Sequence, residues 1–197
     1  LPAFVQANAG DETIAALLED ARREAGEPDA SIDRVIEIFL AWIDEDRKST
    51  PLKALQGHIW KSGYENGDFT GHMYGDAVDY LRQWAADGIR LFVYSSGSVG
   101  AQKLLFGFSD AGDLTPLFEG YFDTTLGHKK EAAAYHSIRA AIGEEAGNIL
   151  FLSDVAEELD AARDAGMRTC QLVRTEDVIV GQHPTARDFA GIIIEHQ

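Results

Sequence analysis

The stretch that decides the fold is Leu91-Phe92-Val93-Tyr94-Ser95-Ser96-Gly97-Ser98, an apolar run that ends abruptly in small polar residues. A second stretch, Ile149-Leu150-Phe151-Leu152-Ser153-Asp154, has the same form. Such runs are typical of buried parallel strands, and open α/β sheets bind their ligands at the carboxyl ends of the strands. We therefore expect the hydroxyls of the first stretch and the carboxylate of the second to meet at one edge of a sheet.

Helical and strand-like segments alternate through the rest of this part of the chain. Helical spacing marks residues 76–87, 98–106, 130–142 and 156–164, and strand-like runs occupy 89–94, 121–123, 148–152 and 167–173. Strands that alternate with helices predict a parallel sheet with right-handed crossovers. The expected fold class is therefore α/β, a Rossmann-like parallel sheet flanked by helices.

The first part of the chain has a purely helical pattern. Apolar residues recur at helical spacing after Asp11 and after Ser31, and Thr50-Pro51 opens a further helix that ends near Gly63. We therefore predict a helical domain over residues 1–75 and an α/β domain over residues 76–197. There is no internal repeat and no low-complexity tract.

Composition limits the classes of partner. The chain has 197 residues, of which 45% are hydrophobic, enough for one domain or for a domain with a smaller insert. The formal net charge of -16 argues against nucleic acid and anionic membrane as partners, because both require a basic surface. An anionic small molecule would need a locally positive site built from a lysine, a cation or helix N-termini.

The single cysteine, Cys170, lies in an apolar strand-like run. One cysteine forms no disulfide within the chain, which fits a reducing compartment and predicts a cytoplasmic protein. A buried thiol that packs as a small apolar side chain is its expected role.

Ser95 and Ser96 are candidate phosphate ligands. They end a strand and precede a helix, where outward-pointing backbone amides and the helix dipole favour an anion. The alternative is a plain helix cap. A serine-hydrolase elbow is excluded because Tyr94 stands where that motif needs glycine, and no histidine has a triad context.

Lys129 is a candidate for neutralising the phosphate. It follows Gly127-His128 and is predicted to open a helix, where a lysine is normally unfavourable because it meets the positive end of the dipole. A phosphate in front of the lysine would relieve that conflict. The alternative is a solvated surface lysine, the role expected for Lys130.

Asp154 is a candidate magnesium ligand, because carboxylate oxygens suit this hard cation. The alternative is that Asp154 caps the helix that follows. Glu158 lies four residues further on and is a candidate supporting group, whereas Glu157 is expected at the surface.

Together these segments resemble the haloacid-dehalogenase-like phosphohydrolases. In that superfamily a strand-end Ser or Thr binds the transferring phosphoryl group, a lysine stabilises it, and an acidic strand end holds magnesium. Residues 93–107, 122–129 and 148–154 are similar to the enolase-phosphatase (acireductone synthase) family of methionine salvage. Leu55-Gln56-Gly57-His58-Ile59-Trp60 resembles a segment of that family's helical cap.

The resemblance implies roles for four residues. Ser95 and Ser96 would bind the substrate phosphate, Lys129 would bind and neutralise it, and Asp154 would bind magnesium. The family enolises 2,3-diketo-5-methylthiopentyl-1-phosphate and then hydrolyses its phosphate to yield the acireductone. The resemblance also implies a haloacid-dehalogenase-like core with an N-terminal helical cap. It further implies a small phosphorylated substrate and a monomeric state for the intact protein.

One part of the family pattern is missing. The nucleophile motif, Asp-x-Glu-Gly-Thr after the first core strand, has no counterpart in the sequence. Asp44-Glu45-Asp46 has Asp-x-Asp spacing, but helical periodicity precedes it and no Gly-Thr follows. We therefore expect a truncated and inactive chain that lacks the first core strand, with unpaired strand edges that favour dimerisation.

Two other functions stay open on the sequence. One is a related phosphatase of the same superfamily that acts on another small phosphate ester. The other is a non-catalytic module that binds phosphate or a protein through the same sheet edge. Phosphate affinity measured separately from turnover would distinguish the module from the enzyme.

Overall fold

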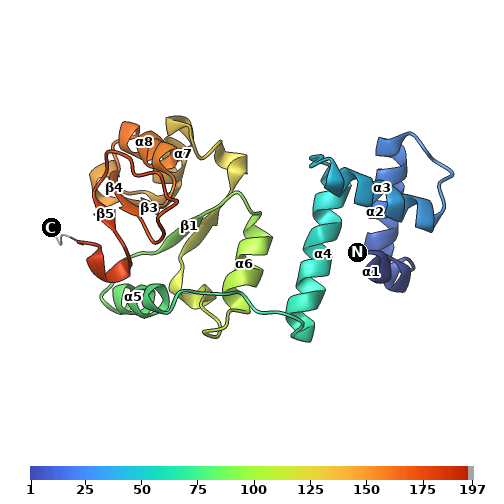
Figure 1. Cartoon of the computed structure of the whole chain (residues 1–197), viewed down its shortest axis with the longest axis horizontal. Coiled ribbons are helices and arrows are strands. Elements are labelled where there is room, and N and C mark those ends of the chain that lie inside the picture. Colours follow the sequence, from blue (N-terminus) through green and yellow to red (C-terminus); the bar gives the residue numbers. More distant parts are fainter. Residues whose placement is uncertain (195–197) are drawn as a thin grey trace. The chain divides into compact units, whose positions relative to one another are not determined.

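A computed structural model describes residues 1–194, and the chain divides into two compact units between Phe69 and Thr70 (Figure 1). We call them the helical unit and the α/β unit. The boundary lies six residues before the one expected from the sequence, between residues 75 and 76. The difference arises because residues 70–75 belong to the α/β unit: Gly71 forms a bridge with Ser109, and the amide of Met73 donates to Asp110.

The helical unit consists of four helices, α1 (Pro2–Asn8), α2 (Glu12–Ala25), α3 (Ile32–Asp44) and α4 (Thr50–Asn66). Asp11 caps α2 and Ser31 caps α3, each accepting hydrogen bonds from backbone amides of the first turn. Helix α4 is capped by Ser49 rather than Thr50. It continues past Gly63 to a left-handed Gly67.

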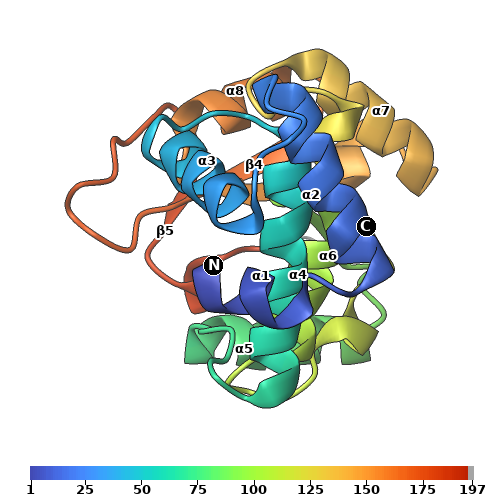
Figure 2. The ribbon, with the colours of Figure 1, turned by 90° about the vertical axis from the view of Figure 1, so that its right-hand side faces the viewer.

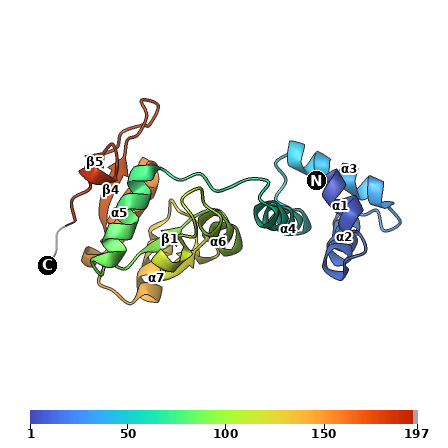
Figure 3. The same cartoon turned by 90° about the horizontal axis from the view of Figure 1, so that it is seen from below.

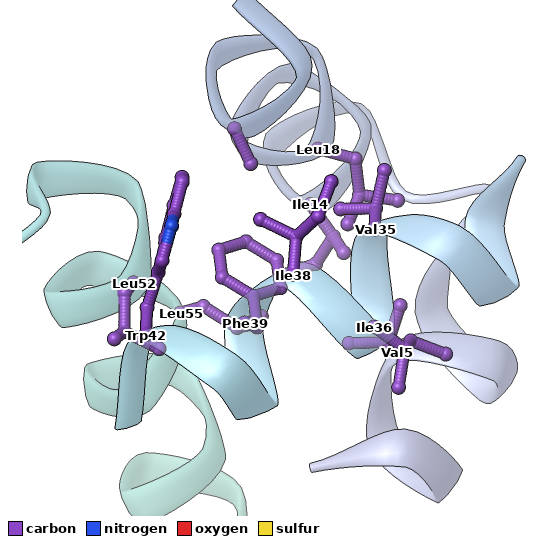
Figure 4. Packing of buried hydrophobic residues seen from close by; sticks show 11 residues of the cluster. Val5, Ile14, Leu18, Val35, Ile36, Ile38, Phe39, Trp42, Leu52 and Leu55 are labelled. Atoms are coloured by element: carbon purple, nitrogen blue, oxygen red, sulfur yellow. The ribbon is translucent and has the colours of Figure 1, made fainter. Parts of the chain in front are cut away.

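Apolar side chains from all four helices fill the core of the helical unit. Phe39 and Leu55 are fully buried, and Trp42 meets Phe39 edge to face (Figure 4). Helix α2 packs against both α3 and α4 (Figure 2). Because α3 contributes five buried side chains to this core, the segment that ends in Asp44 is helical, and the sequence expectation for it is confirmed.

The α/β unit alternates helices with short strands. Its helices are α5 (Gly75–Ala86), α6 (Val99–Gly107), α7 (Ala132–Ile142) and α8 (Ala156–Asp164). Its strands are β1 (Phe92–Tyr94), β2 (Gly120–Phe122), β3 (Leu150–Ser153), β4 (Arg168–Leu172) and β5 (Thr185–Ala186). The α/β class with parallel strands is therefore confirmed, although β1 is three residues shorter than expected and β5 was not expected.

The strands form two parallel sheets, β1–β2 and β3–β4–β5. Within residues 1–194, β1 pairs only with β2, and β3 pairs only with β4, which lies between β3 and β5. Each sheet therefore has an edge, on β1 and on β3, that carries no strand from the described residues.

Helices cover both faces of the strands, and the side chains of β3 alternate between them. Phe151 packs with Tyr135 and Ala162 of α7 and α8. Leu150 and Leu152 pack instead against a cluster that includes Trp84 of α5 and residues of β4 and β5. Helix α5 lies beside β4 and β5 in Figure 3. This two-residue period is the one expected of a strand buried on both faces. Within each sheet the parallel direction brings the carboxyl ends of the strands, with the polar residues that follow them, to one edge.

Cys170 of β4 is buried, as its apolar surroundings in the sequence predicted. No helix within residues 1–194 is long and apolar enough to cross a membrane.

Candidate active site

The turn after β1 is held in shape by its own polar groups. Ser95 donates its backbone amide to the carbonyl of Phe122, and its hydroxyl accepts from the amide of Gly97. Ser98 caps α6 by accepting from the amide of Ala101. Ser98 is therefore the residue that caps α6. Ser96 is exposed, and its hydroxyl makes no hydrogen bond within residues 1–194. Ser96 is thus available to a ligand, and Ser95 shapes the turn that presents it.

Asp123, which sequence reasoning did not single out, ties this turn to the end of β2. One of its carboxylate oxygens accepts from the amide of Val99, at the start of α6. The other oxygen accepts from the amide and the hydroxyl of Thr125. Its signal in the sequence was its place directly after a strand, which is the same signal that marked Asp154.

Lys129 lies in a loop, not at the start of a helix. The prediction that it opens a helix was wrong, because α7 begins at Ala132. The carbonyl of Lys129 accepts the hydroxyl of Tyr135 at 2.6 Å instead of an intrahelical amide. Gly127 has φ +134 and its carbonyl accepts the hydroxyl of Tyr94 at 2.9 Å, so the partly buried Tyr94 and the buried Tyr135 hold the loop.

The Lys129 ammonium reaches the ends of both sheets. Its Nζ lies 2.5 Å from Oε2 of Glu158 and 5.7 Å from the centre of the Tyr94 ring, which is on β1. The same Glu158 oxygen accepts the hydroxyl of Ser153 at 2.9 Å, at the end of β3. Glu158 is mostly buried, with 11% of its side chain exposed. The lysine is therefore a fixed positive charge at the strand ends, and Glu158 is the group that holds it.

Lys130 and Glu157 provide the contrast. They form a longer pair, 3.4 Å between Nζ and Oε1, and more than 60% of each side chain is exposed. Solvent screens such pairs, which contribute little to stability. Both residues lie at the surface, as the sequence predicted.

The tyrosines beside Lys129 stay neutral at physiological pH. Burial raises the pKa of Tyr94 above its usual value, and the nearby Glu158 carboxylate raises it further. Burial and Glu158 raise the pKa of Tyr135 in the same way. Both hydroxyls are therefore hydrogen-bond donors that shape the lysine loop.

Asp154 is exposed directly after β3. Its carboxylate makes no hydrogen bond or ion pair within residues 1–194, and α8 has no side-chain cap, so a capping role is not what the structure shows. The described residues hold no group of three or more possible metal ligands. A closed cation cage is therefore not formed, but Mg²⁺ also binds through one or two carboxylates completed by phosphate oxygens, and Asp154 fits that arrangement.

The residues that follow the strands thus supply an exposed hydroxyl on Ser96, a lysine held by Glu158 and a free carboxylate on Asp154. The lysine and its neighbours come from β1, the loop before α7, and α8, and they are brought together only by the fold. Such a set can bind a phosphate monoester and neutralise its charge. Asp44 is the last residue of α3 and Asp46 follows it, both in the helical unit.

Comparison with known proteins identifies the family. The chain is 58% identical over 195 residues to enolase-phosphatase E1 of Pseudomonas aeruginosa, and the match covers 99% of this chain and 86% of that protein. The chain belongs to the enolase-phosphatase E1 family. Its members are phosphatases, so the enzyme class expected from the sequence is confirmed. No protein-family profile matches the sequence.

Two solved structures are similar to this enolase-phosphatase. The crystal structure of the UTR4 protein of Saccharomyces cerevisiae matches with a TM-score of 0.82 and 33% identity over 97% of this chain and 86% of that one. The L-2-haloacid dehalogenase RSc1362 matches with a TM-score of 0.53 and 18% identity over 90% of this chain and 82% of that one. The second similarity shows the fold alone, which is haloacid-dehalogenase-like.

Proposed function

We propose that this enolase-phosphatase acts in methionine salvage. Its substrate would be 2,3-diketo-5-methylthiopentyl-1-phosphate, converted to the acireductone by enolisation and phosphate hydrolysis. The observation that carries the proposal is the Lys129–Glu158 pair, which holds the ammonium 5.7 Å from the ring of Tyr94 on β1. Family membership supports the choice of substrate.

In this proposal Ser96 and Lys129 would bind the phosphate, and Ser95 would support the turn that carries Ser96. The exposed hydroxyl of Ser96 donates to a phosphate oxygen near the N-terminus of α6, where the helix dipole favours an anion. Ser95 keeps the turn in place through Gly97. Lys129 neutralises charge on the phosphoryl group, and this charge grows in the transition state.

Asp154 would hold a magnesium ion together with phosphate oxygens. When bound, this cation orients the phosphate and spreads its negative charge. Since Asp154 is the only carboxylate that we assign to the ion, we expect magnesium affinity to depend on the presence of phosphate.

A carboxylate nucleophile is not assigned within these residues. The reaction needs an aspartate that forms an aspartyl-phosphate, and the Asp-x-Glu-Gly-Thr motif is absent from the sequence. We therefore propose that the 197-residue chain by itself binds phosphate esters without turning them over. A phosphate-binding function without catalysis is the second candidate, and this absent motif is the observation that favours it.

We further propose that the helical unit is the cap of this family and selects the substrate. The proposed setting is the cytoplasm, with a monomer as the state of the intact enzyme.

The test separates binding from turnover. Isothermal titration calorimetry with inorganic phosphate, with and without Mg²⁺, measures binding by the 197-residue chain. Release of phosphate from the diketo phosphate measures turnover. Binding that Mg²⁺ strengthens, without release, supports the proposal, and release would show that a nucleophile exists among these residues. No binding in either condition would contradict the assigned phosphate site.

A further inference from the structure

Two buried glutamines connect the loops at the carboxyl ends of the strands. Gln102 on α6 is 4% exposed. It contacts the turn after β1, residues 95–98, which we call the phosphate turn. Its side-chain nitrogen donates to the carbonyl of Gly97 at 2.8 Å and to the carbonyl of Phe122 at 2.9 Å. One amide group therefore joins the turn after β1 to the end of β2.

Gln171 on β4 makes the same arrangement in the other sheet. It is fully buried, and its side-chain nitrogen donates to the carbonyl of Asp154 at 2.9 Å and to the carbonyl of Ile179 at 2.8 Å. Its side-chain oxygen accepts from the amide of Gly181. This amide joins the residue after β3 to the loop after β4.

The chemistry of the amide explains why glutamine stands at both positions. An amide nitrogen carries two N–H donors, and here each donor has a backbone carbonyl as its acceptor. The two carbonyls also determine the orientation of each amide, since an exchange of oxygen and nitrogen would set acceptor against acceptor. A carboxylate or an apolar side chain of similar length offers no donor to either carbonyl.

Apolar packing alone would not hold these loops. The segment around Ile179 is exposed, with Ile179 itself 83% exposed, so its backbone is fixed by Gln171 and not by burial of its side chain. Gly181 approaches α8 so closely that a Cβ there would lie 2.8 Å from the Cβ of Ala156. The loop after β4 therefore lies directly beside the residue proposed to bind the cation.

We propose that Gln102 and Gln171 are positioning residues with separate tasks. Gln102 fixes the phosphate turn through Gly97, and Gln171 fixes Asp154 through its carbonyl. That the loops bind phosphate and Mg²⁺ rests on the proposed function. That the two glutamines join the loops rests on the hydrogen bonds alone. Neither glutamine touches the substrate.

The test uses two matched variants, Gln102→Met and Gln171→Met, in the 197-residue chain. Methionine keeps the length of the side chain and removes its amide. Hydrogen–deuterium exchange is measured for peptides that cover residues 95–101 and 177–183. Phosphate binding is measured by calorimetry with and without Mg²⁺.

The expected result is selective. Gln102→Met speeds exchange in 95–101 only and weakens phosphate binding without Mg²⁺ by about tenfold, the effect of one lost hydrogen bond. Gln171→Met speeds exchange in 177–183 only and removes the gain in phosphate affinity that Mg²⁺ provides. Equal effects of both variants on both peptides, or no effect, would overturn the proposal, because a general loss of stability is not selective.

Two further outcomes are distinguishable. If the wild-type chain binds no phosphate, the proposed function fails, and the exchange patterns alone decide whether the glutamines fix the loops. If a methionine variant does not fold, the side-chain amide signals of Gln102 and Gln171 are followed by NMR in the wild-type protein. Slow exchange of both amides and a phosphate-dependent shift of Gln102 alone support the proposal, and rapid exchange of either contradicts it.

Discussion

The ammonium of Lys129 and the carboxylate of Glu158 lie 2.5 Å apart, although 29 positions separate them in the chain. Only 20% of the lysine side chain and 11% of the glutamate side chain are exposed. Removing one partner of such a pair leaves a poorly hydrated charge, which is costly. The pair therefore makes the position of the lysine a property of the fold and not of its local sequence.

Replacing this lysine should abolish much of the phosphate affinity. We expect Lys129→Met to weaken binding of inorganic phosphate by about tenfold or more, since a charge-assisted hydrogen bond is lost. Lys130→Met is the matched control, because Lys130 lies next in the chain but is 62% exposed. Calorimetry measures both variants. Equal losses would indicate that overall charge, and not the fixed position of Lys129, governs binding.

The neighbouring acid can be tested through the cation. Asp154→Asn should remove the increase in phosphate affinity that Mg²⁺ causes, because a neutral amide is a weaker ligand for a hard cation. Phosphate binding without Mg²⁺ should remain within about twofold or rise slightly, since a negative charge beside the anion is lost. Glu157→Gln, at an exposed position nearby, should leave both quantities unchanged. An Mg²⁺ response that persists in Asp154→Asn would refute the metal assignment.

Stability should depend on pH through Asp76 and Arg174. The guanidinium of Arg174 donates to both carboxylate oxygens of Asp76 at 3.0 and 2.7 Å and stacks 4.1 Å above the ring of Tyr74. This pairing holds the pKa of Asp76 below its usual value. Because the pKa of Asp76 is lower in the folded state, the pair stabilises the fold fully at pH values above the unfolded pKa of about 3.9. This stabilisation is lost as the pH falls through the folded-state pKa of Asp76.

Asp76→Asn should therefore lower the free energy of unfolding by about 1–3 kcal/mol at pH 7. The difference from the wild type should shrink as the pH falls below about 4. Urea unfolding at pH 7 and pH 3.5 measures it. The control is Asp79→Asn on the exposed side of α5, which should change little at either pH. A difference that is independent of pH would mean that the charge of Asp76 is not what stabilises the fold.

Gly127 should not tolerate a side chain. Its φ of +134 is a conformation that other residues rarely adopt, and a Cβ there would lie 2.9 Å from the Cβ of Ala134. Gly127→Ala should cost about 1–3 kcal/mol of stability and weaken phosphate binding, since the loop that carries Lys129 would shift. Gly147→Ala, where a Cβ would meet nothing within 4 Å, is the control. Urea unfolding measures the stability of both variants, and calorimetry measures their phosphate binding. Equal stability and equal phosphate affinity of the two variants would contradict the prediction.

Much of the candidate site was visible in the sequence because its residues directly follow apolar strands. Ser95, Ser96 and Asp154 stand after β1 and β3, and a residue that directly follows a strand lies at the carboxyl end of that strand. Asp123 follows β2 in the same way but was passed over, because a three-residue strand is a weak pattern. The position of Lys129 was predicted less well, because its loop is held by tyrosines from β1 and α7 that no local pattern reveals.

The sequence by itself determined the helices, the strand-like runs and the polar residues that end them, because period, caps and turn residues act over a few neighbouring positions. Only the tertiary structure decided that Glu158 holds Lys129, that Asp76 pairs with Arg174, and that two buried glutamines join the loops. These contacts link residues up to 98 positions apart. In each contact the partner compensates the free-energy cost of removing a polar group from water, and no single segment of the chain contains both partners.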